Sequence, residues 1–214
     1  MHYPTLILCL ISALGNQIPG SFLTVLTGIP LYLDTLFTVA VFFSLGLIPA
    51  LITGVFLHIL LIPAAHIFIY RTDTALLTWN LYIFVLCIVV EIFLVYFFHK
   101  RWLKHQEAAF LASPSLHSFL GMAPLLLMLA VLACVVVSIT GGIIDLFITH
   151  FTMPRPQAPE DIFKIGLLRN NMPFLASAIL SRIPINIVDR FFVIFGGYAI
   201  SLLYRKWLAI LKVR

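Results

Sequence analysis

The stretch SRIPINIVDRFF, residues 181–192, places polar and charged side chains at the beginning of a long apolar run. Arg182, Asn186, Asp189 and Arg190 supply two cations, an amide and a carboxylate. Such groups can hold a small polar molecule by hydrogen bonds and ion pairs, but in apolar surroundings each is costly unless it has a partner. This stretch is therefore the first candidate for a functional site.

Residues of the same kinds stand near the ends of other apolar runs, where aromatic rings could stack on a flat ligand and amides and carboxylates could supply donors and acceptors. We expect them to converge on one side of a helical bundle and to line a small-molecule pocket. The predicted ligand-binding residues are Asn16, Gln17, Tyr32, Asp34, Trp79, Asn80, Asp145, Asn186, Asp189 and Arg190.

Simpler roles compete with ligand binding at several of these positions. Asp34 and Asp189 lie in the first turns of predicted helices, where a carboxylate caps free N–H groups and interacts favourably with the helix dipole. Arg182 and Arg190 can pair with Asp189 or extend to lipid headgroups. Asn16 can join two helices by a hydrogen bond. These alternatives stay open at the level of sequence.

No pattern typical of catalysis or of metal binding is present in the sequence. P-loop, GxGxxG, HExxH and GxSxG motifs are all missing. Cys9, Cys87 and Cys134 are single thiols within apolar runs, without the spacing of a disulfide framework or a thiolate site. His58 and His66 have no accompanying ligand pattern. We therefore expect no enzyme, no catalytic residue, no metal and no cofactor, and any energy must come from another chain.

The elements that must position these residues are predicted from composition. The chain is 62% hydrophobic and 10% charged, with a mean hydropathy of +1.12, which is typical of an integral membrane protein. We predict an all-α polytopic membrane protein, a six-helix transmembrane bundle forming one domain over 1–214. The expected spans are about 5–26, 33–48, 50–70, 76–99, 118–141 and 184–205.

Two basic clusters orient the predicted bundle. They follow the fourth and sixth spans, at 100–105 and 204–214, and each contains a tryptophan. Positive residues favour the cytoplasmic side, so both termini are expected inside the cell membrane and the polar layer outside. The net charge of +5 is explained by these clusters, and we predict membrane lipid rather than nucleic acid as a partner.

The connections carry two further expectations. Pro49 should separate the second and third spans in a tight hairpin. Pro159, Glu160 and Asp161 should open a short amphipathic helix at the outer interface, before the last span. The segment 173–205 is either one long helix kinked at Pro184 or a surface segment followed by the sixth span.

Two segments, GIPLYLDTLFTVAVFFSLGLIPALITGVFLHIL (28–60) and RIPINIVDRFFVIFGGY (182–198), resemble the substrate-capture subunits (S components) of energy-coupling factor (ECF) vitamin transporters. The shared features are an Asp-Thr opening of one helix, a glycine-containing hairpin and a Pro-x-x-x-x-Asp-basic opening of another. The resemblance implies capture of a vitamin-like molecule from outside, with a transmembrane coupling protein and two ATPase subunits as partners. The docking motif of small residues in the first helix is only approximated, by Cys9 and Ala13.

Two other readings remain beside that of a transporter subunit. A membrane module could bind a ligand and signal to a partner without transport. A proton-coupled secondary carrier could use Glu91 or Asp34 as a relay.

Overall fold

The computed structural model describes residues 3–16, 18–19, 22, 31–56, 59, 80–151 and 161–211 of the chain. Every regular element in these residues is helical, which confirms the all-α prediction. Two helical stretches, Leu116–His150 and Phe174–Ile210, are long and apolar enough to cross a membrane. Most of the predicted span 50–70 and smaller parts of 5–26 and 76–99 lie outside the described residues.

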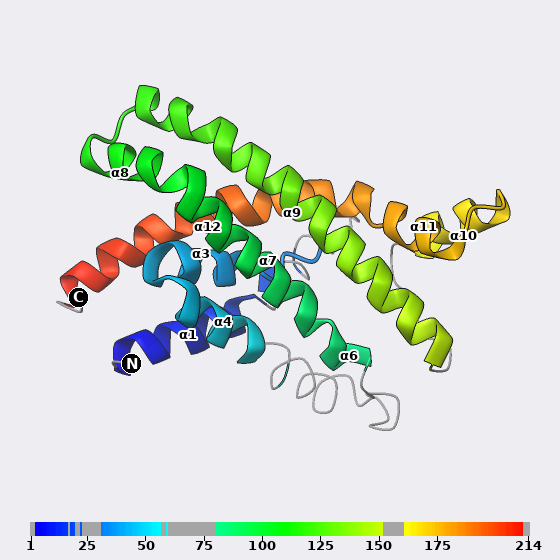
Figure 1. Cartoon of the computed structure of the whole chain (residues 1–214). Coiled ribbons are helices and arrows are strands. Elements are labelled where there is room, and N and C mark those ends of the chain that lie inside the picture. Colours follow the sequence, from blue (N-terminus) through cyan, green and yellow to red (C-terminus); the bar gives the residue numbers. More distant parts are fainter. Residues whose placement is uncertain are drawn as a thin grey trace.

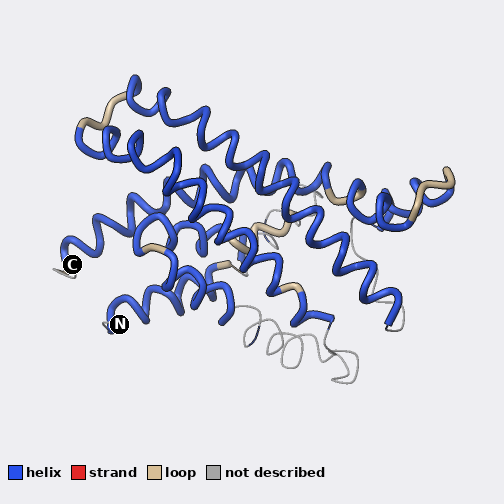
Figure 2. Tube along the Cα trace, viewed as in Figure 1, coloured by secondary structure: helices blue, strands red, loops and turns tan. Residues whose placement is uncertain are grey.

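The helices follow one another in a simple order. They are α1 (Tyr3–Gly15), α3 (Leu36–Leu45), α4 (Leu47–Phe56), α6 (Asn80–Ile83), α7 (Val85–Phe98), the π-helical segment η2 (His99–Leu103), α8 (Lys104–Ala112), α9 (Leu116–Phe151), α10 (Asp161–Arg169), α11 (Phe174–Leu180) and α12 (Ile183–Ile210). Figures 1 and 2 show an elongated bundle in which α7, η2 and α8 form one long rod beside α9.

Three helices, α3, α7 and α12, run in the same direction. Arg190 of α12 contacts Thr35 before α3 and Glu91 of α7. Fifteen residues further along α12, Arg205 contacts Phe43 near the end of α3 and Glu107 of α8, which continues α7. The contacts therefore advance together along all three helices.

The helices α1, α4 and α9 run in the opposite direction. Asn16, directly after α1, meets the beginning of α3, while Cys9 within α1 meets Pro49, beyond the end of α3. In α9, Ser138 meets Asn186 of α12, and the later contacts of α9 lie nearer the beginning of α12. The direction of these six helices thus alternates along the sequence.

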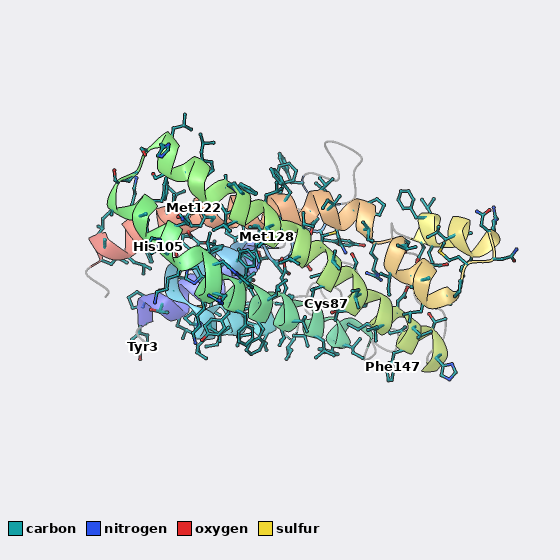
Figure 3. All side chains as sticks on the ribbon, turned by 45° about the horizontal axis from the view of Figure 1, so that its top comes forward. Tyr3, Cys87, His105, Met122, Met128 and Phe147 are labelled. Carbon is teal, nitrogen blue, oxygen red and sulfur yellow. The ribbon has the colours of Figure 1, made fainter. Side chains whose placement is uncertain are left out.

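The alternation brings particular parts of the chain to the same end of the molecule. Both termini and α8 lie at one end, and α10 and α11 lie at the other (Figure 1). In Figure 3, Tyr3 and His105 mark the first end, and Phe147 lies toward the second. The basic residues at 100–105 and 204–206 therefore share one end, as the predicted topology requires.

The hairpin between the second and third predicted spans turns at Gly46, not at Pro49. Gly46 has a φ of 92°, in the region that favours glycine because a Cβ would be strained there. Pro49 lies within the first turn of α4, where its missing N–H has no intrahelical acceptor. The prediction that Pro49 separates the spans was wrong, although the hairpin itself is as tight as expected.

The helical stretch Phe174–Ile210 is interrupted once, so that it comprises α11 and α12. A turn at Ser181 and Arg182 ends α11, and Pro184 occupies the first turn of α12. The predicted amphipathic helix corresponds to α10, which begins at Asp161. The fifth predicted span, 118–141, is the central part of α9, whose 36 residues extend for about 54 Å.

Close packing of α3 on α12 sets the position of the polar residues. A Cβ built on Gly197 would lie 2.8 Å from Cγ1 of Val39 and 3.0 Å from the carbonyl oxygen of Leu36. Both neighbours belong to α3, so only a glycine permits this approach. The close contact brings the beginning of α3 within reach of the side chains of α12.

Candidate functional site

A buried group of charged residues surrounds Arg190, and we call it the Arg190 cluster: Asp34, Thr35, Glu91, Asp189 and Arg190. Nη1 of Arg190 lies 2.7 and 2.6 Å from the two carboxylate oxygens of Glu91 and donates to Thr35 Oγ1 at 2.6 Å. Nη2 lies 3.0 Å from Oδ2 of Asp189 and 3.5 Å from Oδ1 of Asp34. One guanidinium therefore joins α12 to α7 and to the residues that precede α3.

Asp189 holds a strained turn in place. Its Oδ1 accepts a hydrogen bond of 2.8 Å from the backbone N–H of Leu33. Leu33 has a φ of 47°, a left-handed conformation that costs a branched residue about 1–3 kcal/mol. The carboxylate does not cap its own helix, as the simpler interpretation required, but fixes the conformation that presents Tyr32 and Asp34.

A free backbone N–H at the beginning of α3 is satisfied by a residue from outside the helix, not by the N-cap side chain. Thr35 is the N-cap residue, yet its side-chain oxygen accepts from Arg190 and makes no capping hydrogen bond. Instead, Oδ1 of Asn16 accepts from the backbone N–H of Phe37 at 2.7 Å, and Nδ2 of Asn16 donates to Thr38 Oγ1 at 2.9 Å. Both polar ends of Asn16 are thus used to attach α1 to α3.

The members of the Arg190 cluster differ in exposure. Glu91, Asp189, Arg190 and Thr35 are at most 4% exposed, whereas the side chain of Asp34 is 36% exposed. With all groups ionised, three carboxylates against one guanidinium give a formal charge of −2. Charge of this density away from water is stabilised only by a partner or by protonation. The open carboxylate is that of Asp34.

A second charged group lies at the other end of α12, and we call it the Arg205 cluster: His99, Glu107, Arg205 and the carbonyl of Phe43. Oε1 of Glu107 lies 2.5 Å from Nη2 of Arg205, and Oε2 lies 2.6 Å from Nε2 of His99. Nη2 of Arg205 also donates to the Phe43 carbonyl. This cluster fastens α8 and η2 to the ends of α3 and α12.

A third group ties α10 to α9. Nζ of Lys164 lies 2.9 Å from Oδ2 of Asp145 and 2.7 Å from Oδ1 of Asp161. Arg182 approaches the same oxygen of Asp145 at 3.9 Å. Asp145 is fully buried, so these ion pairs pull the polar side of α10 inward.

The structure brings together three of the predicted site residues, Asp34, Asp189 and Arg190, with Tyr32 in the same turn. Asn186 lies one turn earlier on α12 and donates to Ser138 of α9 at 2.9 Å, and Asp145 lies in the third group. Asn80 begins α6, but its side chain is not described, and Gln17 and Trp79 lie outside the described residues. The predicted polar layer is therefore divided into separate groups.

Sequence reasoning did not include Glu91 or Thr35 among the site residues. Glu91 was visible as a single carboxylate deep in an apolar run. Because a buried charge needs a counter-charge, this carboxylate and an arginine within another span are natural partners.

Comparisons with protein families, curated proteins and solved structures find no match to this chain.

Proposed function

We propose that this chain is a polytopic membrane protein that captures a small molecule at the Arg190 cluster, as the substrate-binding subunit of an ECF-type transporter. The end carrying Asp34 faces outward, and the end carrying the Arg205 cluster faces the cytoplasm. The captured molecule is vitamin-like, and a coupling protein with two ATPase subunits supplies the energy. The proposal assigns no catalytic residue, metal or cofactor to the chain.

One observation carries this proposal. Charged residues that are far apart in the sequence meet around Arg190, and one of their carboxylates is open to the outside of the protein. Buried ionisable groups in membrane proteins commonly mark substrate or ion sites. An exposed aromatic residue, Tyr32, stands two positions before Asp34, and aromatic residues near a few polar groups are common in small-molecule sites.

The orientation of α10 supports a membrane environment. Ile162, Phe163 and Ile165 are 77%, 50% and 44% exposed, while the Lys164 side chain between them is only 11% exposed. A helix lying in water would show the opposite arrangement, with its lysine outward. An amphipathic helix that turns its apolar side outward fits the lipid surface, at the end of the bundle opposite both termini.

The directions of the helices support the six-span topology. Helices α3, α7 and α12 correspond to the second, fourth and sixth predicted spans and run in one direction, while α1, α4 and α9 run in the other. Even-numbered and odd-numbered spans must alternate in this way if both termini lie on one side. The basic residues at the shared end make that side the cytoplasmic one.

A proton-coupled carrier is the second candidate, because both carboxylates considered as relays, Glu91 and Asp34, contact the same arginine. The two hydrogen bonds from Arg190 to Glu91 favour a fixed ion pair over a proton relay. We therefore consider a proton-coupled carrier a weaker candidate than a transporter subunit.

The test uses the full chain reconstituted in lipid nanodiscs and in vesicles. A panel of water-soluble vitamins and their precursors is screened by thermal shift, and hits are measured by isothermal titration. We expect saturable binding and no ATPase activity by the chain alone. Uptake into vesicles should require a coupling protein, two ATPases and ATP. Accumulation by this chain alone, driven by a proton gradient, would instead support the carrier, and the absence of any ligand would contradict both candidates.

A further inference from the structure

Hydrogen bonds are unevenly distributed within the Arg190 cluster. Glu91 receives two hydrogen bonds from Nη1 of Arg190. In contrast, Oδ1 of Asp34, Oδ2 of Asp189 and Nε of Arg190 have no hydrogen-bond partner among the described residues, although the two oxygens face Nη2 of Arg190. Buried polar atoms are rarely left in this state, because each loses its hydrogen bonds to water.

The unsatisfied atoms are shielded from water and lie in a region with too little positive charge. Asp189 is fully buried and Arg190 is 4% exposed, so bulk water does not reach them readily. Arg190 supplies one positive charge for three carboxylates, and its strongest contacts go to Glu91. The negative charge that remains is concentrated at Asp34 and Asp189, beside the solvent-accessible edge of the cluster.

An aromatic residue, Tyr32, stands two positions before Asp34 in the sequence. Tyr32 and Asp34 flank Leu33, whose backbone Asp189 holds, and both are partly exposed: Tyr32 by 36% as a residue and Asp34 by 36% at its side chain. A carboxylate beside an aromatic ring is a common arrangement for recognising an organic cation, since the carboxylate accepts hydrogen bonds and the ring face attracts positive charge.

We propose that the ligand of the Arg190 cluster is an organic cation, whose ammonium, amidinium or quaternary ring nitrogen is held against Asp34 and the Tyr32 ring. This inference rests on the proposed function and names the charge class of its ligand. A bare metal ion fits less well, because no group of three or more His, Cys, Asp or Glu side chains in the described part of the chain is arranged to hold one.

Matched compounds that differ in charge but hardly in shape test the proposal. The first set is 1-methylnicotinamide, nicotinamide and nicotinate, and the second is benzamidine, benzamide and benzoate. Binding is measured by saturation-transfer NMR on the full chain in phosphatidylcholine nanodiscs, with empty nanodiscs as the blank. We expect the cation of at least one set to bind and its neutral and anionic relatives to bind at least about tenfold more weakly.

Two variants separate the site from general effects of charge. Asp34→Asn keeps the shape and removes the charge, and it should weaken binding of the cation at least about tenfold. Asp161→Asn makes the same chemical change in the ion pair with Lys164, at α10, and should leave binding unchanged. Thermal unfolding of both variants confirms that they are folded.

The outcomes are distinguishable from failure of the proposed function. Equal binding by neutral or anionic compounds, cation binding that survives Asp34→Asn, or no binding by any of the six compounds would overturn the inference. Saturable binding of a neutral or anionic vitamin from the wider panel would still support a ligand-binding subunit. Failure of every compound in that panel would contradict the proposed function as well.

Discussion

The Arg190 and Arg205 clusters are built on one plan and differ in charge. In each, an arginine of α12 contacts a carboxylate from the α7–α8 rod and one end of α3. The Arg205 cluster has one carboxylate for one arginine, and His99 contacts the second oxygen of that carboxylate. The Arg190 cluster has three carboxylates around one arginine. The comparison shows that one carboxylate and one arginine can join the same helices, and the additional carboxylates at Arg190 are the feature on which the proposed ligand site depends.

The largest expected effect concerns the sides of the membrane that the two clusters face. Single cysteines replace Ser113, in the turn between α8 and α9, and Asn170, after α10, in a chain lacking its three natural cysteines. A membrane-impermeant maleimide should label Asn170→Cys in intact cells and Ser113→Cys only after permeabilisation, because positive residues favour the cytoplasmic side and the proposed topology therefore places the Arg205 end inside. Labelling of Ser113→Cys in intact cells would reverse the assignment.

Removal of the two arginines should show how differently the clusters depend on them. Arg190→Ala leaves three carboxylates without their buried counter-charge and should lower the free energy of unfolding by about 3–5 kcal/mol. Arg205 is 28% exposed and faces one carboxylate, so Arg205→Ala should cost about 1–2 kcal/mol. Unfolding by denaturant in mixed micelles measures both. Equal losses would remove the distinction between the clusters.

Glu107→Gln tests whether the Arg205 cluster is a fastening. The amide keeps the shape of the side chain but loses the charge that attracts both Arg205 and His99, and we expect a loss of about 1–2 kcal/mol. Ligand affinity should be unchanged, since the Arg190 cluster lies at the other end of α12. Titration of the ligand into this variant provides the check, and a substantial fall in affinity would show that the two ends are coupled.

The smallest expected change in stability belongs to Asp34→Asn. Removing one of three carboxylates lowers the surplus of negative charge and leaves the other two with Arg190. The ligand-free protein should therefore be unchanged or stabilised, by up to about 1 kcal/mol, as is often seen when a binding residue is replaced. Thermal unfolding without ligand tests this. A loss of 2 kcal/mol or more would make Asp34 a structural residue.

The sequence allowed the all-α class and the meeting of Asp34, Asp189 and Arg190 to be predicted, because apolar composition excludes other elements and buried charges need partners. The sequence indicates how far along a helix each polar residue lies, but it does not indicate which neighbouring helix that residue faces. These helices are apolar all round, so periodicity marks no buried face. We therefore assigned three residues to one pocket although each contacts a different helix: Asn16 contacts α3, Asn186 contacts α9, and Asp145 contacts α10.

The turn at Gly46 and the partner of Glu91 show the same limit at a finer scale. Gly46 and Pro49 are three residues apart in an apolar stretch, and both residue types can interrupt a helix. Only the three-dimensional path of α4 decides between them. Glu91 lies 99 residues from Arg190 in sequence, and no local pattern connects them.

Helix α12 is unbroken between Arg190 and Arg205, a separation of about 22 Å. If Glu107→Gln does lower ligand affinity, this rod acts as a lever: a roll or tilt of α12 that moves Arg190 also moves Arg205 relative to Glu107 and to the end of α3. Such a linkage works in both directions. In that case a partner protein that binds the Arg205 end more tightly in one position of α12 would change the ligand affinity at the Arg190 end by the same factor by which the ligand changes the affinity for the partner.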